Sequence, residues 1–188
     1  MQRARLLLLL GAIAVLRPDL AFRHSEPAAP EPPKQQGFHL LGVSSFDLFP
    51  VTNLSLISWF FLICFPRWSF LKPAVFLGPI INAVIYCVVI LYTVRNPDAP
   101  QGSIQSLEGI AAFFSNSDAV FAGWLHYCVF DPLVGLGEVL DSQKLKVPHL
   151  LVVPCLLMTM LAGPVGFLMY LSVRWIVLWV KDDYYMVQ

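Results

Sequence analysis

The chain has 188 residues, of which 57% are hydrophobic and 13% are charged, and its formal net charge at pH 7 is zero. Soluble domains carry about 25% charged residues, so the composition excludes an ordinary soluble protein and indicates an integral membrane protein. This length suits one compact domain, and a net charge of zero argues against nucleic acid as a partner.

The first 21 residues are predicted to be a signal-peptide-like leader. Two arginines precede an apolar run at residues 6–16, which is shorter than the roughly 20 residues of a membrane-spanning helix. Ala21 offers a cleavage site before Phe22. A phenylalanine directly after the cut is similar to the bipartite presequences of algae with complex plastids. We therefore expect residues 1–21 to lead the protein to such a plastid.

Residues 22–47 are predicted to be a transit or linker segment. Up to Gln36 they are rich in proline and polar side chains, which bury too little apolar surface to fold, so we expect disorder here. Glu26 and Glu31 are unusual in a transit peptide, which is normally poor in acidic residues. Ordinary secretion with a disordered arm is therefore the alternative.

Four apolar runs follow, and they predict an all-α fold: a four-helix transmembrane bundle over residues 48–181, after the disordered N-terminal segment. The spans are expected at about residues 48–65, 73–94, 119–134 and 147–173. The first two are long enough to cross a hydrocarbon core of about 30 Å at about 1.5 Å per residue. Arginine and tryptophan at positions 67 and 68 are typical of a helix end at the headgroup level.

The third and fourth runs contain further signals. Residues 115–118 supply helix-start chemistry, and residues 136–146 are interpreted as the polar connection between the two runs. Pro154 and Pro164 predict one tilted and kinked final span. The connections after the first and third runs are richer in Lys and Arg than the middle one, which holds only Arg95. The positive-inside bias therefore places these two connections on one side, the stroma in a plastid, and both termini on the other.

The four cysteines fall one in each apolar run and form no C-x-x-C pair: Cys64, Cys87, Cys128 and Cys155. This spacing does not suit a zinc or redox site, so we expect no metal and treat each cysteine as a small buried hydrophobic residue. Motifs for nucleotide binding, serine-type acyl transfer and metal-dependent hydrolysis do not occur in the sequence either.

Polar residues inside the runs are the candidates for function, because titratable groups in hydrocarbon are costly. Asn82 is expected either to bond to a neighbouring helix or to line a cavity. Thr159 is expected to bond back to its own helix. His126 and Asp131 both lie in the apolar segment G-W-L-H-Y-C-V-F-D at residues 123–131.

His126 and Asp131 are five residues apart, which places them about 140° apart around an ideal helix. Asp131 should share its face with two aromatic residues, at positions 124 and 127, while His126 faces towards position 130. A joint site would need a distortion at Pro132 or a partner on another helix, and His149 at the start of the last run is the candidate. The alternative is a buried hydrogen-bond network that only fixes helix register.

Several stretches of the third and fourth runs are distinctive as a set. They are A-G-W-L-H-Y-C-V-F-D at residues 122–131, D-S-Q at 141–143, V-P-H-L-L-V-V-P-C-L-L-M-T-M at 147–160 and G-P-V-G-F-L at 163–168. With them, about residues 48–171 resemble the ABA-deficient-four-like membrane proteins, whose plant members are required to make the allenic carotenoid neoxanthin from violaxanthin. The family commonly continues after the aspartate as D-L-F-x-x-R, whereas Leu136 stands here in place of the arginine. An activity that needs this arginine is therefore not implied.

The resemblance implies an integral protein of the thylakoid or envelope that isomerises an epoxy-xanthophyll, such as violaxanthin, to an allenic product, such as neoxanthin, without a cofactor. The epoxide oxygen gains a proton and the neighbouring polyene carbon loses one, which requires an acid, a base and a dry apolar slot. Asp131 and either His126 or His149 would supply the acid and the base, in either order. The expected binding residues are aromatic walls and one amide: Trp124, Tyr127, Phe130 and Asn82.

A rival hypothesis is a non-catalytic subunit that binds pigment or packs against a photosynthetic complex. The expected partners are a carotenoid substrate and the lipid bilayer, with other carotenoid enzymes or a photosystem antenna complex as further candidates. A membrane protein of the secretory pathway is the third possibility.

Overall fold

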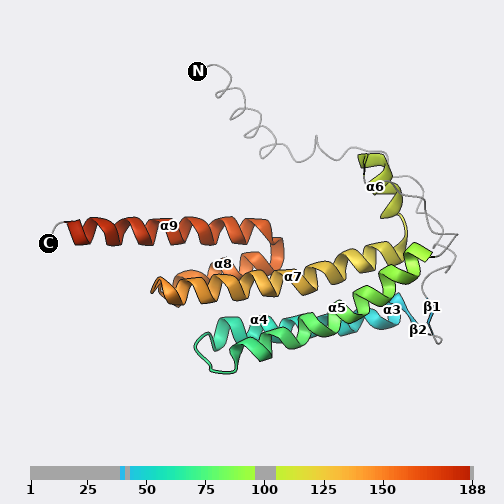
Figure 1. Ribbon diagram of the computed structural model, residues 1–188, viewed down its shortest axis with the longest axis horizontal. Coiled ribbons are helices and arrows are strands. Elements are labelled where there is room, and N and C mark those ends of the chain that lie inside the picture. Colours follow the sequence, from blue (N-terminus) through green and yellow to red (C-terminus); the bar gives the residue numbers. More distant parts are fainter. Residues whose placement is uncertain (1–38, 41–42, 96–104, 187–188) are drawn as a thin grey trace, which may run out of the picture. The chain divides into compact units, whose positions relative to one another are not determined.

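The computed structural model describes residues 39–40, 43–95 and 105–186. The predicted leader, residues 1–21, lies outside the described residues, as does most of the predicted linker at residues 22–47. The expected disorder of that segment therefore stays a prediction. Figure 1 shows the course of the helices.

The first membrane-spanning segment is Ser45–Cys64, which is built from three consecutive helical pieces. The elements up to this point are β1 (His39–Leu40), β2 (Val43–Ser44), α3 (Ser45–Leu48), η1 (Phe49–Asn53) and α4 (Leu54–Cys64). Strands β1 and β2 form a short antiparallel pair. The Ser44 side chain accepts a hydrogen bond from Asp47 N, and Asp47 Oδ2 accepts one from Ser44 N at 2.9 Å, which is a capping box. The helical segment therefore begins three residues before the predicted 48.

Helix α5 (Leu71–Arg95) is long and carries Pro79 in its interior. Proline has no N–H, so the carbonyl four residues earlier, that of Val75, loses its usual helical partner. The buried Ser58 of α4 donates its hydroxyl to Val75 O at 2.8 Å. A serine of the neighbouring helix therefore replaces the missing backbone hydrogen bond.

The same compensation occurs in α7 (Ser117–Lys144), which follows the short helix α6 (Leu107–Phe113). Pro132 leaves the Cys128 carbonyl without a helical donor, and Ser55 of α4 donates to Cys128 O at 2.8 Å. Helix α7 thus runs through Pro132 and continues to Lys144. The predicted span 119–134 is too short, and most of the predicted connection at 136–146 is helix.

Ser58→Ala is expected to lower the free energy of unfolding by about 1–3 kcal/mol, because it leaves a buried carbonyl without a donor. Ser172→Ala is the matched control, since Ser172 is exposed and donates only to Leu168 O of its own helix. Thermal unfolding of both variants in detergent measures the difference. Equal melting temperatures for the two variants would contradict this role of Ser58.

The last apolar run forms two helices, α8 (His149–Ala162) and α9 (Pro164–Met186), and α9 runs back alongside α8 (Figure 1). The prediction of one kinked span at 147–173 is therefore wrong. The chain reverses because Gly163 has a φ of +28°, a conformation that side chains other than glycine rarely adopt, and Pro164 follows it. At Gly166, a Cβ atom would overlap with the backbone nitrogen of Thr159, so only glycine permits this close approach of the two helices.

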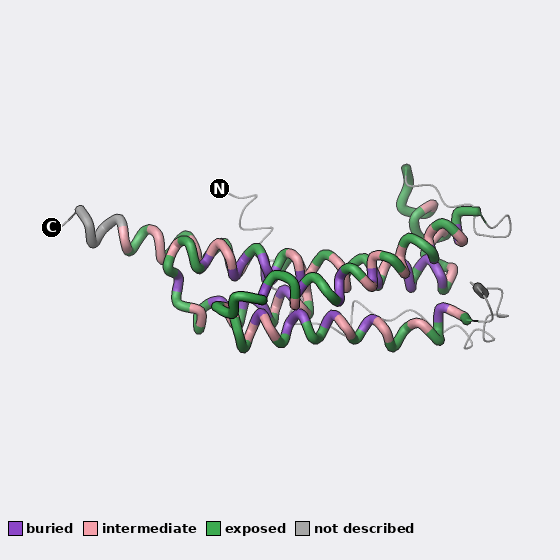
Figure 2. Tube along the Cα trace, turned by 60° about the horizontal axis from the view of Figure 1, so that its bottom comes forward, coloured by how far each residue is buried: buried purple, intermediate pink, exposed green. Residues whose placement is uncertain are grey.

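Four helical segments are long and apolar enough to cross a membrane: Ser45–Cys64, Leu71–Arg95, Ser117–Lys144 and Pro164–Lys181. Figure 2 shows buried positions alternating with intermediate and exposed ones along the long helices. Many large apolar side chains face outwards, as expected for helices surrounded by lipid. The predicted fold class, an all-α transmembrane bundle with four such helices, is confirmed, and the chain is a multi-pass membrane protein.

The core divides into two parts along the bundle. The larger cluster joins α4, α5, α7, α8 and α9 around buried residues such as Leu62, Val75, Val139 and Leu156. The smaller cluster lies mainly between α5 and α7 and includes Val89 and Leu125. Helices α8 and α9 thus add to one half of the bundle only.

The cysteines do not behave alike. Cys155 is buried and Cys128 is partly buried, whereas Cys64 and Cys87 are exposed. The expectation that all four are buried is wrong for these two. A small apolar side chain that faces lipid carries little cost, because lipid tails are as apolar as the core.

Candidate functional site

A groove of about 430 Å³ lies between η1–α4, α7 and the turn that joins α8 to α9. Its lining includes Ser55 and Leu56 of α4, Trp124, Tyr127 and Asp131 of α7, and Gly163 of the turn. These walls are mostly apolar. The groove therefore suits a ligand with an apolar body and a polar group.

Asp131 is the carboxylate of this groove. It is partly buried, and a Cβ atom added at Gly163 would lie 3.4 Å from Asp131 Oδ1, so the turn packs directly against the carboxylate. Within the described part of the chain, Asp131 makes neither a hydrogen bond nor an ion pair. Its oxygens are therefore available to a bound ligand.

Trp124 and Tyr127 lie on the same face of α7 as Asp131, as the helical spacing predicts, and both line the groove. Trp124 stacks on Phe49 of η1, with ring centroids 6.1 Å apart. Trp124 and Tyr127 therefore supply aromatic surface to the groove on the face of α7 that carries the carboxylate. Aromatic surface of this kind suits a planar or ring-shaped ligand group.

His126 and Phe130 face away from the groove. Their rings contact each other with centroids 4.6 Å apart, and His126 also lies 6.2 Å from the ring of Tyr86 on α5. Helix α7 is not interrupted at Pro132, so no distortion brings His126 round to Asp131. The structure does not bring these two residues into a common cavity.

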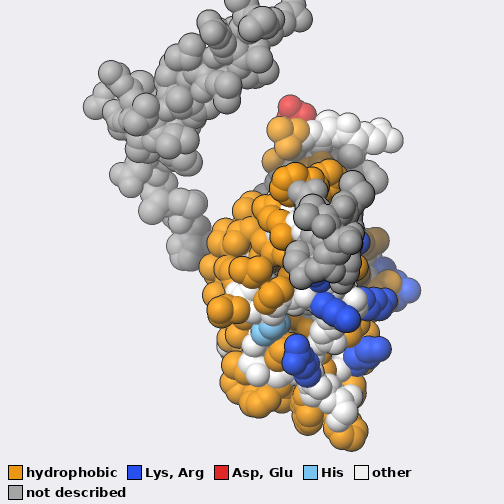
Figure 3. Space-filling view, turned by 90° about the vertical axis from the view of Figure 1, so that its left-hand side faces the viewer, with side chains coloured by type: hydrophobic (Ala, Val, Ile, Leu, Met, Phe, Trp, Pro, Cys, Tyr) orange, Lys and Arg blue, Asp and Glu red, His pale blue; other side chains and the backbone are white. Residues whose placement is uncertain are grey.

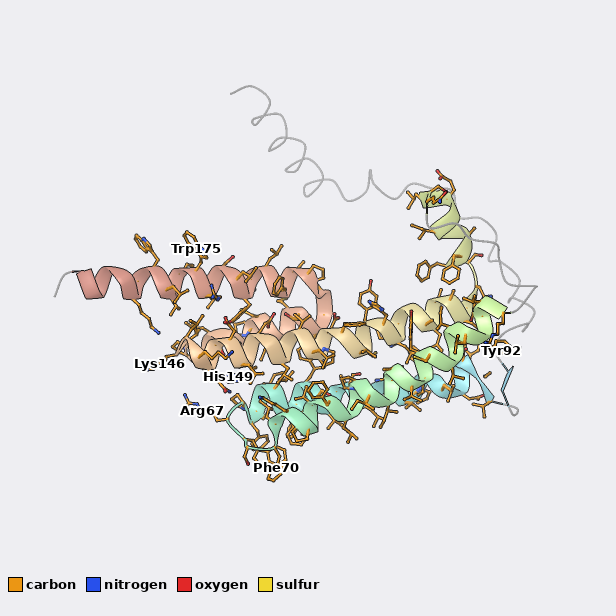
Figure 4. The ribbon with its side chains drawn as sticks, in the orientation of Figure 1. Arg67, Phe70, Tyr92, Lys146, His149 and Trp175 are labelled. Atoms are coloured by element: carbon orange, nitrogen blue, oxygen red, sulfur yellow. The ribbon has the colours of Figure 1, made fainter. Side chains whose placement is uncertain are left out.

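His149 lies at the other end of α8 from the turn. Its Nε2 is 2.9 Å from Ile63 O at the end of α4, and it lines an open pocket with Arg67 and Trp68. Figure 4 shows Arg67, Lys146 and His149 at the same end of the bundle. Since α8 rises about 1.5 Å per residue over 14 residues, His149 is about 20 Å from the level of Asp131. The expected meeting of His149 and Asp131 does not occur.

Asn82 contacts the groove indirectly, through the groove-lining residue Ser55. Its Nδ2 donates to Ser55 Oγ at 2.9 Å, and Ser55 in turn donates to Cys128 O. The interpretation of Asn82 as a bond between helices is therefore confirmed, and it is not among the groove-lining residues. Sequence reasoning missed Ser55. The signal was present, because Pro132 predicts a carbonyl at position 128 that needs a donor.

Glu138 is a second residue that sequence reasoning missed. Its position falls in the predicted connection, but it is 2% exposed inside α7 and accepts a hydrogen bond from Thr159 Oγ1 at 2.9 Å. The expectation that Thr159 bonds to its own helix is therefore wrong. Glu138 stands seven residues after Asp131 and so shares its face of the helix, which was the available signal. Its Oε2 has no partner among the described residues.

Metal binding has no obvious site in the described ranges. No group of three His, Cys, Asp or Glu side chains there is close enough to hold an ion. The polar features of the groove are one carboxylate and hydroxyl, amide and backbone groups.

These features define the class: a multi-pass helical membrane protein with a carboxylate in a mostly apolar groove. A family model described as ABA DEFICIENT 4-like matches residues 47–170, which is more than half of the 188 residues. The chain belongs to this family. No curated protein and no solved structure matches the chain.

Proposed function

We propose that this protein isomerises the epoxide end group of a xanthophyll such as violaxanthin to an allenic end group, as in neoxanthin, within a plastid membrane. The observation that carries the proposal is Asp131, a carboxylate in a mostly apolar groove that makes no hydrogen bond or ion pair among the described residues. The reaction itself is inferred from membership of the family and from the activity that the resemblance to this family implies.

The groove suits such a substrate in shape and polarity. A xanthophyll has a long apolar polyene and an oxygen-bearing ring at its end, so the ring would lie against Trp124 and Tyr127 with its epoxide near Asp131. The apolar walls would exclude water, which strengthens the effect of a proton donor on the epoxide oxygen. A ligand of this kind would reach the groove from the hydrocarbon of the bilayer.

The geometry favours one carboxyl group acting in both roles, because neither His126 nor His149 reaches the groove. Protonated Asp131 gives its proton to the epoxide oxygen as the bond from that oxygen to the ring carbon beside the polyene breaks. The carboxylate then takes the proton from the neighbouring polyene carbon, and the electrons of that C–H bond form the additional double bond of the allene. The oxygen remains on the ring as a hydroxyl, and Asp131 regains its proton, so no atom or electron is gained or lost.

The test is to express the protein with violaxanthin in a host that lacks neoxanthin and to separate the pigments by chromatography. We expect an allenic product. Unchanged violaxanthin in the presence of correctly inserted protein would contradict the proposal. Migration of the protein with a pigment complex after mild solubilisation would then favour the alternative, a non-catalytic pigment-binding or accessory subunit, for which exposed Trp175 and Trp179 on α9 provide an outer apolar surface.

A further inference from the structure

The turn between α8 and α9 lies halfway along α7. It packs against Asp131, which stands midway between Ser117 and Lys144, the two ends of the helix. Helix α8 has only 14 residues, about 21 Å at 1.5 Å per residue, which is less than the thickness of a hydrocarbon core of about 30 Å. From its start at His149, α8 therefore ends near mid-depth of the bundle.

Helix α9 then returns along the second half of α7. Tyr170 Oη and Arg174 Nε both donate to Asp141 Oδ2, at 2.6 and 2.9 Å. Further on, Lys181 Nζ donates to Leu145 O at 2.6 Å, at the C-terminal end of α7. Later residues of α9 thus meet later residues of α7, so the two helices are parallel and end on the same side of the bundle.

This side is the basic end. Six of the seven Lys and Arg residues in the described ranges lie there, in the α4–α5 and α7–α8 connections, in the adjoining ends of α5 and α7, or on α9: Arg67, Lys72, Lys144, Lys146, Arg174 and Lys181. Figure 3 shows several of them gathered on this face. Three acidic residues, Asp47, Glu108 and Asp118, lie near helix starts at the opposite end. Acidic residues also occur toward the basic end, among them Asp141 of α7 and Asp182 and Asp183 of α9, so it is the distribution of Lys and Arg that distinguishes the two ends.

We propose that the α8–α9 hairpin enters the membrane from the basic end, turns at the depth of Asp131 and leaves on the same side. The end of α9 then lies on the side of the two basic connections, the positive-inside face, and not on the opposite side as expected from four full spans. Beyond the turn, the groove between α4 and α7 is left open to the other leaflet, where a lipid-soluble ligand gains access. The access of a ligand to the groove rests on the proposed function, whereas the path of the hairpin does not.

The backbone of the turn suits such a depth. In hydrocarbon, each backbone polar group needs a partner within the protein. Gly163 N donates to Thr159 O at 2.9 Å, Phe167 N donates to Gly163 O at 3.1 Å, and Pro164 has no N–H to satisfy. Both backbone groups of Gly163 are therefore paired within the protein, and Pro164 adds no donor.

Helix α9 is long and apolar enough to cross a bilayer by itself, but an arrangement in which it does so is unfavourable in this bundle. It would place the turn and Asp131 at a membrane surface and push the first half of α7 into water. That half contains exposed apolar side chains, among them Val120, Trp124 and Phe130. Removing them from lipid would cost about 25 cal/mol for each Å² of apolar surface.

Cysteine labelling tests the path of the hairpin without any substrate. In a variant with the four native cysteines replaced by alanine, single cysteines are introduced by Lys146→Cys, Leu161→Cys and Glu108→Cys, and one is appended after Gln188. Sealed vesicles are treated with a membrane-impermeant maleimide from one side or from both. We expect the appended cysteine to react from the same side as position 146, position 108 to react from the other side, and position 161 to react only after denaturation.

Reaction of the appended cysteine from the side opposite to position 146 would overturn the proposal, as would labelling of position 161 in intact vesicles. If the variant without native cysteines fails to fold, protease protection of a C-terminal epitope tag on the otherwise native chain gives the same answer. If a protease added to one side cleaves the α7–α8 connection but leaves the tag intact, the proposal is also overturned.

The open half of the groove is tested by the carotenoid retained through purification. Leu56→Trp places a larger side chain in the groove, and Ile57→Trp is the control, because Ile57 is an exposed neighbour on α4 that does not line it. We expect only Leu56→Trp to lower retention, by at least about threefold, since overpacking typically costs about 1–3 kcal/mol. Equal carotenoid retention in both variants would overturn the proposed access to the groove. The labelling experiment and the activity assay would still test the path of the hairpin and the proposed function independently.

Discussion

Asp131→Asn is expected to abolish the conversion of violaxanthin to an allenic product. Asparagine keeps the size of the side chain but can neither donate a carboxylic proton nor accept one, and general acid–base catalysis contributes about 10²–10⁴-fold to a rate. Because Asp131 has no hydrogen bond or ion pair within the described residues, its replacement should leave the fold intact. The measurement is product per amount of inserted protein, determined by chromatography.

The two histidines are the matched controls for this experiment. His126 faces Tyr86 and Phe130, and His149 bonds to Ile63 O at the basic end, so His126→Gln and His149→Gln should retain activity within a few-fold. An active Asp131→Asn variant would remove Asp131 from the mechanism. Loss of activity in His126→Gln, with normal protein levels, would restore the assignment of a separate base.

Gly166→Ala is expected to destabilise the protein more than any other glycine-to-alanine change in the described helices. The new Cβ would overlap with the nitrogen of Thr159, and this neighbour is backbone, which cannot rotate away. Overpacking a well-filled core costs about 1–3 kcal/mol, and we expect about 3 kcal/mol or more here because the whole hairpin must separate. Folded yield in detergent and thermal unfolding measure the effect.

Gly137→Ala provides the comparison, because nothing lies within 4 Å of the Cβ that it would add to α7. Alanine also has a higher helix propensity than glycine, by about 1 kcal/mol. This variant should therefore be as stable as the original chain or more so. Similar losses of stability in both variants would show that Gly166 is not required for the close packing of α8 against α9.

Helical periodicity predicted the faces of α7 correctly. A rotation of about 100° per residue is a local property of the backbone, so the spacing alone places Trp124, Tyr127 and Asp131 together and His126 apart from them. Composition correctly predicted a membrane protein with long apolar helices for a similar reason. In hydrocarbon, every residue of a span needs its backbone hydrogen bonds satisfied within the protein.

The reversal at Gly163 could not be predicted in the same way. Gly-Pro marks either a kink or a turn, and the choice depends on whether the following helix finds a surface to pack against. That surface is provided by Thr159 opposite Gly166 and by Asp141, which accepts hydrogen bonds from α9. The prediction that His149 meets Asp131 was wrong for the same reason. Because the last residue of α8 lies at the turn beside Asp131, its first residue, His149, must lie a full helix length away.

The two serines of α4 have a consequence for biosynthesis. Ser55 and Ser58 supply the donors that Pro132 in α7 and Pro79 in α5 remove. Until α4 is beside them, each of these later helices would carry an unpaired carbonyl into hydrocarbon, at a cost of about 1–3 kcal/mol. Because α4 precedes both in the chain, a ribosome that delivers the helices in order places the donor in the membrane before either acceptor arrives.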